Sequence, residues 1–112
     1  MIVTNVESLT KTKFIVEVDG KFAFVLYKGE LKRFGVTQGA ELSEEVYQQI
    51  RTEIILKRAK LRAMHLLTDM ARTEKGLREK LRQGHYPEDI IEQAMDYVRS
   101  FGYLDDRKYA ES

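Results

Sequence analysis

What the sequence lacks already restricts its chemistry. The 112 residues include no cysteine, which excludes disulfide bonds and thiolate metal sites and suits a reducing cytoplasm. No apolar stretch approaches the roughly 20 residues of a membrane-spanning helix. The first five residues contain no basic side chain, so they do not resemble the start of a secretory signal. We therefore expect a cytoplasmic protein that has no membrane partner.

The motifs of common catalytic sites are missing as well. There is no glycine-rich phosphate loop and no nucleophile motif, and His65 and His85 lie at no ligand spacing from each other or from a carboxylate pair. A surface or packing role is the simpler interpretation of both histidines. Asp105 and Asp106 could form an acid pair, but helix capping accounts for them without chemistry. We predict no catalytic residue, metal, cofactor or small-molecule substrate, and therefore no enzyme.

The charge is distributed unevenly, although the net charge is only +1. Residues 1–50 carry 6 basic and 7 acidic side chains, a net of −1, and residues 51–83 carry 10 basic and 4 acidic, a net of +6. Residues 84–112 carry 3 basic and 7 acidic, a net of −4. A basic centre followed by an acidic segment is a pattern that often marks partner binding.

The first 42 residues have the composition of β-structure. Segments 13–18 and 21–26 are rich in β-branched and aromatic residues, and Asp19-Gly20 between them favours a two-residue type I′ turn. Alternation places Phe14, Val16 and Val18 on one face of the first strand, and it places Phe22, Phe24 and Leu26 on one face of the second. The phenylalanines could stack nucleic-acid bases on an open sheet, but packing against a helix requires the same alternation, and the strands lack interleaved basic residues.

Two shorter elements accompany the hairpin. We expect an earlier strand near residues 3–9, because an isolated hairpin is only marginally stable in water. A short helix over residues 27–34, stopped by Gly35, follows the hairpin. Together these elements predict a β-rich N-terminal subdomain over residues 1–42.

From Ser43 onward the pattern is helical. Ser43 is a suitable N-cap, and no proline or glycine follows until Gly76, so one long helix is possible. Its apolar residues form two stripes about 150° apart. The first stripe is Val46, Ile50 and Ile54, and the second is Leu56, Ala59, Ala63, Leu66 and Met70. Such a helix is typical of a connector whose first half covers the hairpin and whose second half joins a helical core; a break near residues 55–57 is the alternative.

Two further helices are expected, one over residues 74–83 and one from Pro87 to about Phe101, with Thr73 as the cap of the first and Gly84 as its stop. Their core positions are Leu77, Leu81, Ile90, Ile91, Ala94, Val98 and Phe101. The sequence thus predicts an α+β chain in which the β-hairpin subdomain precedes a three-helix repeat. That repeat, with the connector helix, covers residues 43–104, and residues 105–112 begin a second, truncated repeat.

Basic side chains gather on two of these helices. The partner-contact residues that we predict from helix-face geometry are Arg58, Arg62, Arg72, Lys75, Arg78 and Arg82. Arg51 and His65 share the face of the first two. A solvated helix face supported by local pairs, such as Glu74 with Arg78, is the simpler alternative. The excess of basic residues favours an anionic partner, either DNA phosphate or an acidic protein surface.

A helix-turn-helix is a further interpretation of two helices joined by a short turn. In that motif the second helix enters the major groove with basic and amide side chains at its start. Here that helix begins Pro87-Glu88-Asp89 and continues with Glu92 and Asp96. Because carboxylates repel phosphates, we do not expect this helix to bind a specific groove sequence.

Ordered motifs in the second half resemble the repeat of the RecX family. They are residues 72–81 (RTEKGLREKL), residues 84–87 (GHYP) and residues 97–110 (YVRSFGYLDDRKYA), and residues 63–67 are similar to the first helix of that repeat. Their ordered combination, above all Gly-Tyr-Leu-Asp-Asp ahead of a Tyr-Ala helix, is more specific than any single motif. The hairpin resembles the additional N-terminal domain of many family members from Gram-positive bacteria.

The resemblance implies tandem three-helix repeats and a regulatory function in homologous recombination, DNA repair and the SOS response. That function is inhibition of the RecA recombinase through binding to its filament on single- or double-stranded DNA. A general DNA-binding helical module without a recombinase partner, and a purely structural helical adaptor, are the alternatives. Gly76 departs from the family, which commonly has glutamate there, and this weakens the helix by up to about 1 kcal/mol. The chain also ends as a second repeat begins, so we expect it to be the N-terminal part of a longer protein.

Overall fold

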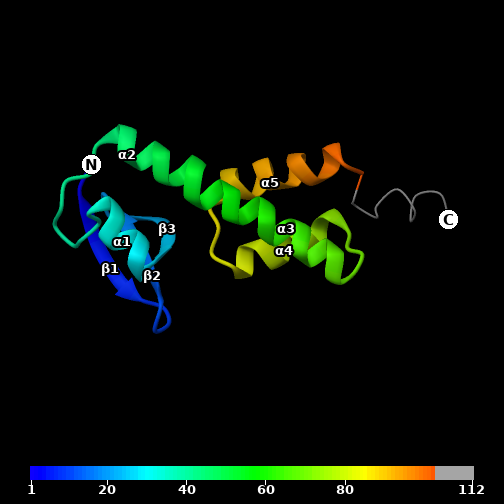
Figure 1. Ribbon diagram of the computed structural model, residues 1–112, viewed down its shortest axis with the longest axis horizontal. Helices are drawn as coiled ribbons and strands as arrows, with labels where there is room; N and C mark the ends of the chain where they lie inside the picture. The colour runs from blue at the N-terminus through cyan, green and yellow to red at the C-terminus, as the bar shows by residue number, and fades with distance from the viewer. Residues whose placement is uncertain (103–112) are drawn as a thin grey trace. The chain divides into compact units, whose positions relative to one another are not determined.

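The first part of the chain forms a three-stranded antiparallel sheet in the order β1-β2-β3 (Figure 1). The strands are β1 (Val3–Ser8), β2 (Lys13–Val18) and β3 (Lys21–Tyr27) in a computed structural model that describes residues 1–102. Asp19 and Gly20 adopt φ angles of 52° and 79°, the positive values that a type I′ turn requires. The predicted hairpin and the expected earlier strand are both confirmed.

Phe22 is the exception to the predicted apolar face. Val16 pairs with Phe24 but Glu17 pairs with Phe22, so Ala23 is an extra residue that forms a bulge in β3. Phe22 keeps the register set by the turn and lies on the face of Glu17, and the bulge brings Phe24 to the opposite face, beside Val16. Phe24 is fully buried, whereas Phe22 is 44% exposed. The prediction of one shared face is therefore wrong for Phe22, because strict alternation does not allow for a bulge.

Two helices complete the first of the two units into which the chain divides, Met1–Thr52. Helix α1 (Lys28–Phe34) ends at Gly35, whose φ of 64° is left-handed as in many helix termini. Helix α2 (Glu44–Gln49) begins after Ser43, whose hydroxyl accepts a hydrogen bond from the Val46 amide at 3.2 Å. The Tyr47 ring of α2 lies 5.8 Å from the Phe24 ring, so α2 packs on the apolar face of the sheet. The buried side chains of this unit are Val3, Val16, Val18, Ala23, Phe24, Leu26, Val36, Leu42 and Ile50.

The helical backbone continues past α2 without the break that was considered near residues 55–57. It passes through a π-helix, η1 (Ile50–Leu56), into α3 (Lys57–Asp69). Ile55, which the α-helical period assigned to neither apolar stripe, is buried, while Ile54 is only half-buried. Ile50 and Ile55 are five residues apart, the hydrogen-bond spacing of a π-helix. The wider turn therefore buries Ile55 where the α-helical period predicted Ile54.

The second unit begins at Glu53 and, in the described residues, contains α3, α4 (Glu74–Gln83) and α5 (Glu88–Ser100). Each of these three helices packs against the other two. Thr73 caps α4 as predicted, since its hydroxyl accepts a hydrogen bond from the Gly76 amide at 3.1 Å. The buried side chains are Ile55, Ala59, Ala63, Leu66, Leu77, Leu81, Ile90, Ile91, Ala94, Met95 and Val98.

Two residues predicted to belong to this core lie at the surface instead. Met70 is 58% exposed because the backbone has left the helix there and is extended, with φ −160° and ψ 150°. Phe101 is 53% exposed and packs its ring edge-on against Tyr97, with the ring centroids 5.0 Å apart. Met95, which was not predicted, is fully buried. Helical periodicity fixes which side chains share a stripe, but neither the width of the buried stripe nor the point where burial ends.

Within residues 1–102, no helix is both long and apolar enough to cross a membrane. The predicted cap at Asp105 and the start of a second repeat over residues 105–112 lie outside the described residues.

Candidate interaction surface

All six predicted partner-contact residues lie in the three-helix unit. Arg58 and Arg62 are on α3, one helical turn apart, and Arg72 is in the segment between α3 and α4. Three more are on α4, namely Lys75, Arg78 and Arg82. The structure therefore groups them by helix into an α3 pair and an α4 stripe. Whether they contact a partner stays a prediction.

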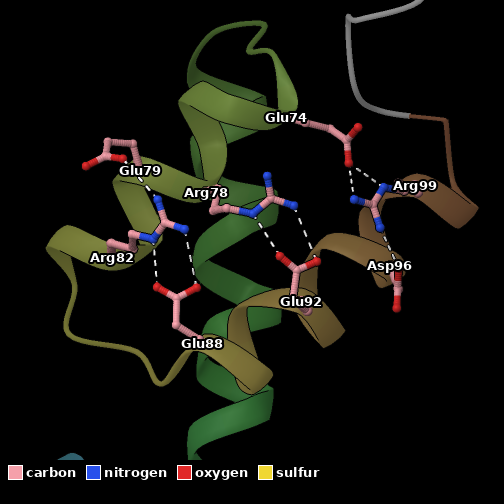
Figure 2. Close-up of polar contacts among 8 residues, drawn as sticks. All are labelled: Glu74, Arg78, Glu79, Arg82, Glu88, Glu92, Asp96 and Arg99. Atoms are coloured by element: carbon pink, nitrogen blue, oxygen red, sulfur yellow. Dashed lines mark hydrogen bonds and ion pairs between the residues drawn. The ribbon is translucent and has the colours of Figure 1, made fainter.

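Arg78 pairs with a carboxylate of the neighbouring helix. Its Nε donates to Glu92 Oε1 at 2.8 Å and a terminal nitrogen donates to Glu92 Oε2 at 3.3 Å, a two-pronged contact that Figure 2 shows. The Arg78 side chain is 25% exposed and that of Glu92 is 49% exposed. The local partner expected from the sequence was Glu74. The structure gives Arg78 a partner fourteen residues away, because α5 packs back along α4.

Arg82 repeats this arrangement one turn further along α4. Its Nε donates to Glu88 Oε1 at 2.7 Å, a terminal nitrogen donates to Glu88 Oε2 at 3.4 Å, and the other reaches Glu79 at 3.3 Å. The hydrogen bonds from Arg82 lower the pKa of Glu88 below its ordinary value. The same hydrogen bonds raise the pKa of Arg82. Both groups therefore stay charged in the folded protein at neutral pH.

A third ion pair joins the same two helices, but here the arginine belongs to α5 and the glutamate to α4. Arg99 of α5 donates to Glu74 at the start of α4 and also pairs with Asp96 one turn before it. The hydrogen bond with Glu74 raises the pKa of Arg99. We call these three contacts the Arg–Glu ladder: Arg78–Glu92, Arg82–Glu88 and Arg99–Glu74 (Figure 2). Because all its members are partly exposed to solvent, each pair of the ladder contributes little to stability.

Arg72 is engaged in a different way. Its Nε donates to the backbone carbonyl of Leu66 at 3.2 Å, in the last turn of α3. The same carbonyl also accepts a hydrogen bond from the Met70 amide at 3.2 Å, so Arg72 is its second donor, and a cation at this end complements the helix dipole. Arg72 therefore has a structural role at the end of α3, and a partner anion would have to compete with that carbonyl.

The remaining predicted residues differ in exposure. Arg62 and Lys75 are exposed, and Arg58 is half-buried. Arg62 also lines a shallow surface hollow on the last turns of α3 together with His65, Leu66, Thr68 and Asp69. No group of His, Cys, Asp or Glu side chains in residues 1–102 is arranged to hold a metal ion.

The acidic partners of the arginines were not predicted from the sequence. In the sequence, Glu88 and Glu92 were interpreted as carboxylates that would repel phosphate, and Arg99 received no role. A usable signal was present, since Arg78 and Arg82 are four residues apart and so are Glu88 and Glu92. In two antiparallel helices joined by a short turn, such mirrored spacing brings each arginine opposite one glutamate.

One family model and several individual proteins match this chain in sequence. Residues 59–97, which include most of α3, all of α4 and most of α5, match the family model described as RecX, first three-helix domain. A protein named regulatory protein RecX from Leuconostoc citreum is 31% identical over 98 residues, which are 88% of this chain and 37% of that protein. One of the same name from Caldanaerobacter subterraneus is 30% identical over 112 residues, 99% of this chain and 57% of that protein.

A solved structure described as the crystal structure of regulatory protein RecX has the same fold. It superimposes with a TM-score of 0.53 at 28% identity, over 97% of this chain and 54% of that one. This chain thus spans between 37% and 57% of the length of the relatives compared. Sequence matches over most of the chain and the shared fold together show that this chain belongs to the RecX family of regulatory proteins.

Proposed function

We propose that this protein inhibits a RecA recombinase by binding the filament that the recombinase forms on DNA. Membership of the RecX family is the observation that carries the proposal, because the matched relatives are named regulatory proteins and the matched segment is the three-helix unit. The role is regulatory and not enzymatic. RecA filament is the proposed partner, and single- or double-stranded DNA is contacted as a component of that filament.

The charge of α3 supports contact with phosphates. Between Lys57 and Asp69 this helix carries four basic side chains and one carboxylate, which leaves a net charge of +3. Exposed basic side chains of this kind bind the DNA backbone without reading its sequence. We therefore propose Arg58 and Arg62 as phosphate contacts, together with Lys75 on α4. Arg58 also takes part in an interaction within the protein. It stays in the proposed surface together with Arg72, Arg78 and Arg82 as a residue that must exchange an internal partner for an external one.

The division of the chain proposed from the sequence also has a functional meaning. Residues 1–42 are the β-rich subdomain, residues 43–104 the first repeat with its connector helix, and residues 105–112 the start of a second repeat. In this proposal the repeat carries the filament contact. The β-rich subdomain is an appended module whose contacts are separate from the basic face.

Binding to three targets tests the proposal. Fluorescently labelled protein is titrated with single-stranded DNA, with free RecA and with RecA filaments assembled on that DNA, each at two salt concentrations. We expect the tightest binding to the filament and a matching loss of RecA-catalysed ATP hydrolysis. A full-length RecX relative, such as that of Caldanaerobacter subterraneus, is measured alongside for comparison.

A charge-reversal pair locates the contact. R62E/K75E removes two exposed cations from the three-helix unit, and K28E/K32E removes two exposed cations from α1 with the same change in net charge. We expect the first variant to lose filament binding at least tenfold more than the second. Equal binding of the wild type to bare DNA and to filament would instead indicate a general DNA-binding module. Absence of binding to all three targets would leave only a structural adaptor.

A further inference from the structure

The arginines of the α4 stripe do not face solvent as a simple positive surface. Arg78, Arg82 and Arg99 are interleaved with five carboxylates, Glu74, Glu79, Glu88, Glu92 and Asp96, so these eight side chains together carry a net charge of −2 (Figure 2). Glu74 and Glu79 belong to α4 itself, and Glu88, Glu92 and Asp96 come from α5. The surface that remains has alternating charges of both signs.

The carboxylates occupy one of the two-donor forks through which each of these arginines could bind a phosphate. Each of Arg78 and Arg82 directs its Nε and one terminal nitrogen at the two oxygens of one glutamate. Two-pronged recognition of phosphate by arginine uses the same donors in the same fork. A phosphate can bind either guanidinium in this way only after the glutamate has moved aside.

Displacing the glutamates has a second cost when the ligand is bare nucleic acid. Glu88 and Glu92 would then be left unpaired beside a chain of phosphates, which adds repulsion between like charges. A partner that also presents cationic side chains removes this cost, because it can pair with the released carboxylates. Displacing the glutamates therefore costs more free energy when the ligand is uniformly negative than when it carries charges of both signs.

We propose that the Arg–Glu ladder is an interaction surface that favours a partner carrying both anionic and cationic groups, the protein–nucleic acid surface of a filament, over bare nucleic acid. Glu88 and Glu92 are its specificity-determining residues. The inference rests on the proposed function only in taking the recombinase filament as the mixed-charge partner. The weaker binding of bare DNA follows from the ladder itself.

The test compares two neutralising variants of equal charge. E88Q/E92Q removes the competing carboxylates, and E44Q/E45Q removes two exposed carboxylates from the first turn of α2, in the other unit. Both variants and the wild type are titrated against labelled oligothymidylate and against RecA filaments, at the same salt concentration. Circular dichroism and thermal melting check that each variant is folded. A third variant, E88Q/E92Q combined with R78Q/R82Q, tests whether any gain depends on the released arginines.

We expect E88Q/E92Q to bind oligothymidylate on the order of tenfold more tightly than E44Q/E45Q does. Filament affinity should change less than about threefold, so the preference for filament over bare DNA falls. The variant that also lacks the two arginines should lose the gain. Equal gains in the two double variants, or a gain that survives loss of the arginines, would overturn the inference.

The proposed function and this inference have separate readouts in that experiment. Filament binding by the wild type tests the proposed function. The change in bare-DNA binding of E88Q/E92Q relative to E44Q/E45Q tests the ladder, whether or not the filament is bound.

Discussion

At the scale of single residues, the turn between α4 and α5 shows that a glycine can be required for space and not for its φ angle. Gly84 ends α4 as predicted, but its φ is −81°, and the left-handed φ of 62° belongs to His85. A Cβ at Gly84 would lie 2.9 Å from the Tyr86 ring and 3.3 Å from the Leu81 carbonyl oxygen. The close approach of Tyr86 therefore explains this glycine.

Replacing Gly84 with alanine should destabilise the protein by about 1–3 kcal/mol, because the Tyr86 ring must move. Gly29 is the matched control, since it lies in α1 with a negative φ and a Cβ there meets nothing within 4 Å. Gly29→Ala should raise stability by about 0.5 kcal/mol through helix propensity. Urea unfolding of the three proteins measures both effects. A G84A variant as stable as the wild type would contradict the packing argument.

Glu88 predicts a specific dependence of stability on pH. Because hydrogen bonds from Arg82 lower its pKa, Glu88 stabilises the folded state fully above the unfolded pKa of about 4.3. This contribution is lost as the pH falls through the lower folded pKa. The difference in melting temperature between the wild type and E88Q should therefore be constant near neutral pH and should shrink towards pH 3. A difference that is the same at pH 7 and pH 3 would show that the Arg82 contact has no effect on stability.

At the scale of secondary-structure elements, the bulge in β3 separates two phenylalanines that look equivalent in the sequence. Phe24 is fully buried beside Tyr47, and Phe22 is 44% exposed on the opposite face. Phe24→Ala should cost about 3–5 kcal/mol through the loss of buried contacts. Phe22→Ala should cost less than about 1 kcal/mol. Thermal melting of the two variants checks this, and similar losses in both would place Phe22 in the core after all.

The π-helix η1 behaves like an α-helix with one inserted residue. Deletion of Thr52, an exposed residue in η1, brings Ile55 to four residues from Ile50, which is the spacing of an ordinary α-helix. We expect this deletion variant to fold with a regular helix and to melt at the same temperature as the wild type or above it. Its amide exchange should show protection throughout residues 50–56.

Deletion of Leu61 is the control for that variant. Leu61 is 64% exposed in α3, but its removal rotates Ala63 and Leu66 by about 100° relative to Ala59 and disrupts the buried stripe. It should destabilise the three-helix unit by more than about 2 kcal/mol. If both deletions lowered the stability equally, the fold would require the π-helix, and η1 would not be an α-helix that tolerates one extra residue.

At the scale of the whole molecule, pairing within the protein limits how strongly it can respond to salt. The six predicted basic residues would give a slope of about 5.4 in log K against log salt on duplex DNA if each contacted one phosphate. Arg72, Arg78 and Arg82 have internal acceptors. We therefore expect the wild type to show a slope of no more than about 2.7.

Binding to duplex DNA measured between low and moderate salt gives this slope directly. The E88Q/E92Q variant should be steeper, because two more arginines become available to phosphate. A wild-type slope near the value for six contacts would mean that the internal pairs open without resistance, and it would contradict both the ladder and its proposed selectivity.

Much of this protein follows from local sequence signals. The hairpin, the caps at Ser43 and Thr73 and the helix stops at Gly35 and Gly84 depend on residues adjacent in the chain, and all are present. The ordered motifs of the helical half were enough to indicate the RecX family. These features are determined by neighbouring residues, so tertiary contacts were not needed to predict them.

Other features were decided only by tertiary packing. The bulge that puts Phe22 and Phe24 on opposite faces depends on pairing with another strand. The burial of Ile55 depends on a change of helical period that no single residue signals. The partners of Arg78 and Arg82 come from a different helix. A helix wheel shows which charges share a face of one helix. Only the packing of α5 against α4 decides that these positive charges meet carboxylates before they meet a partner.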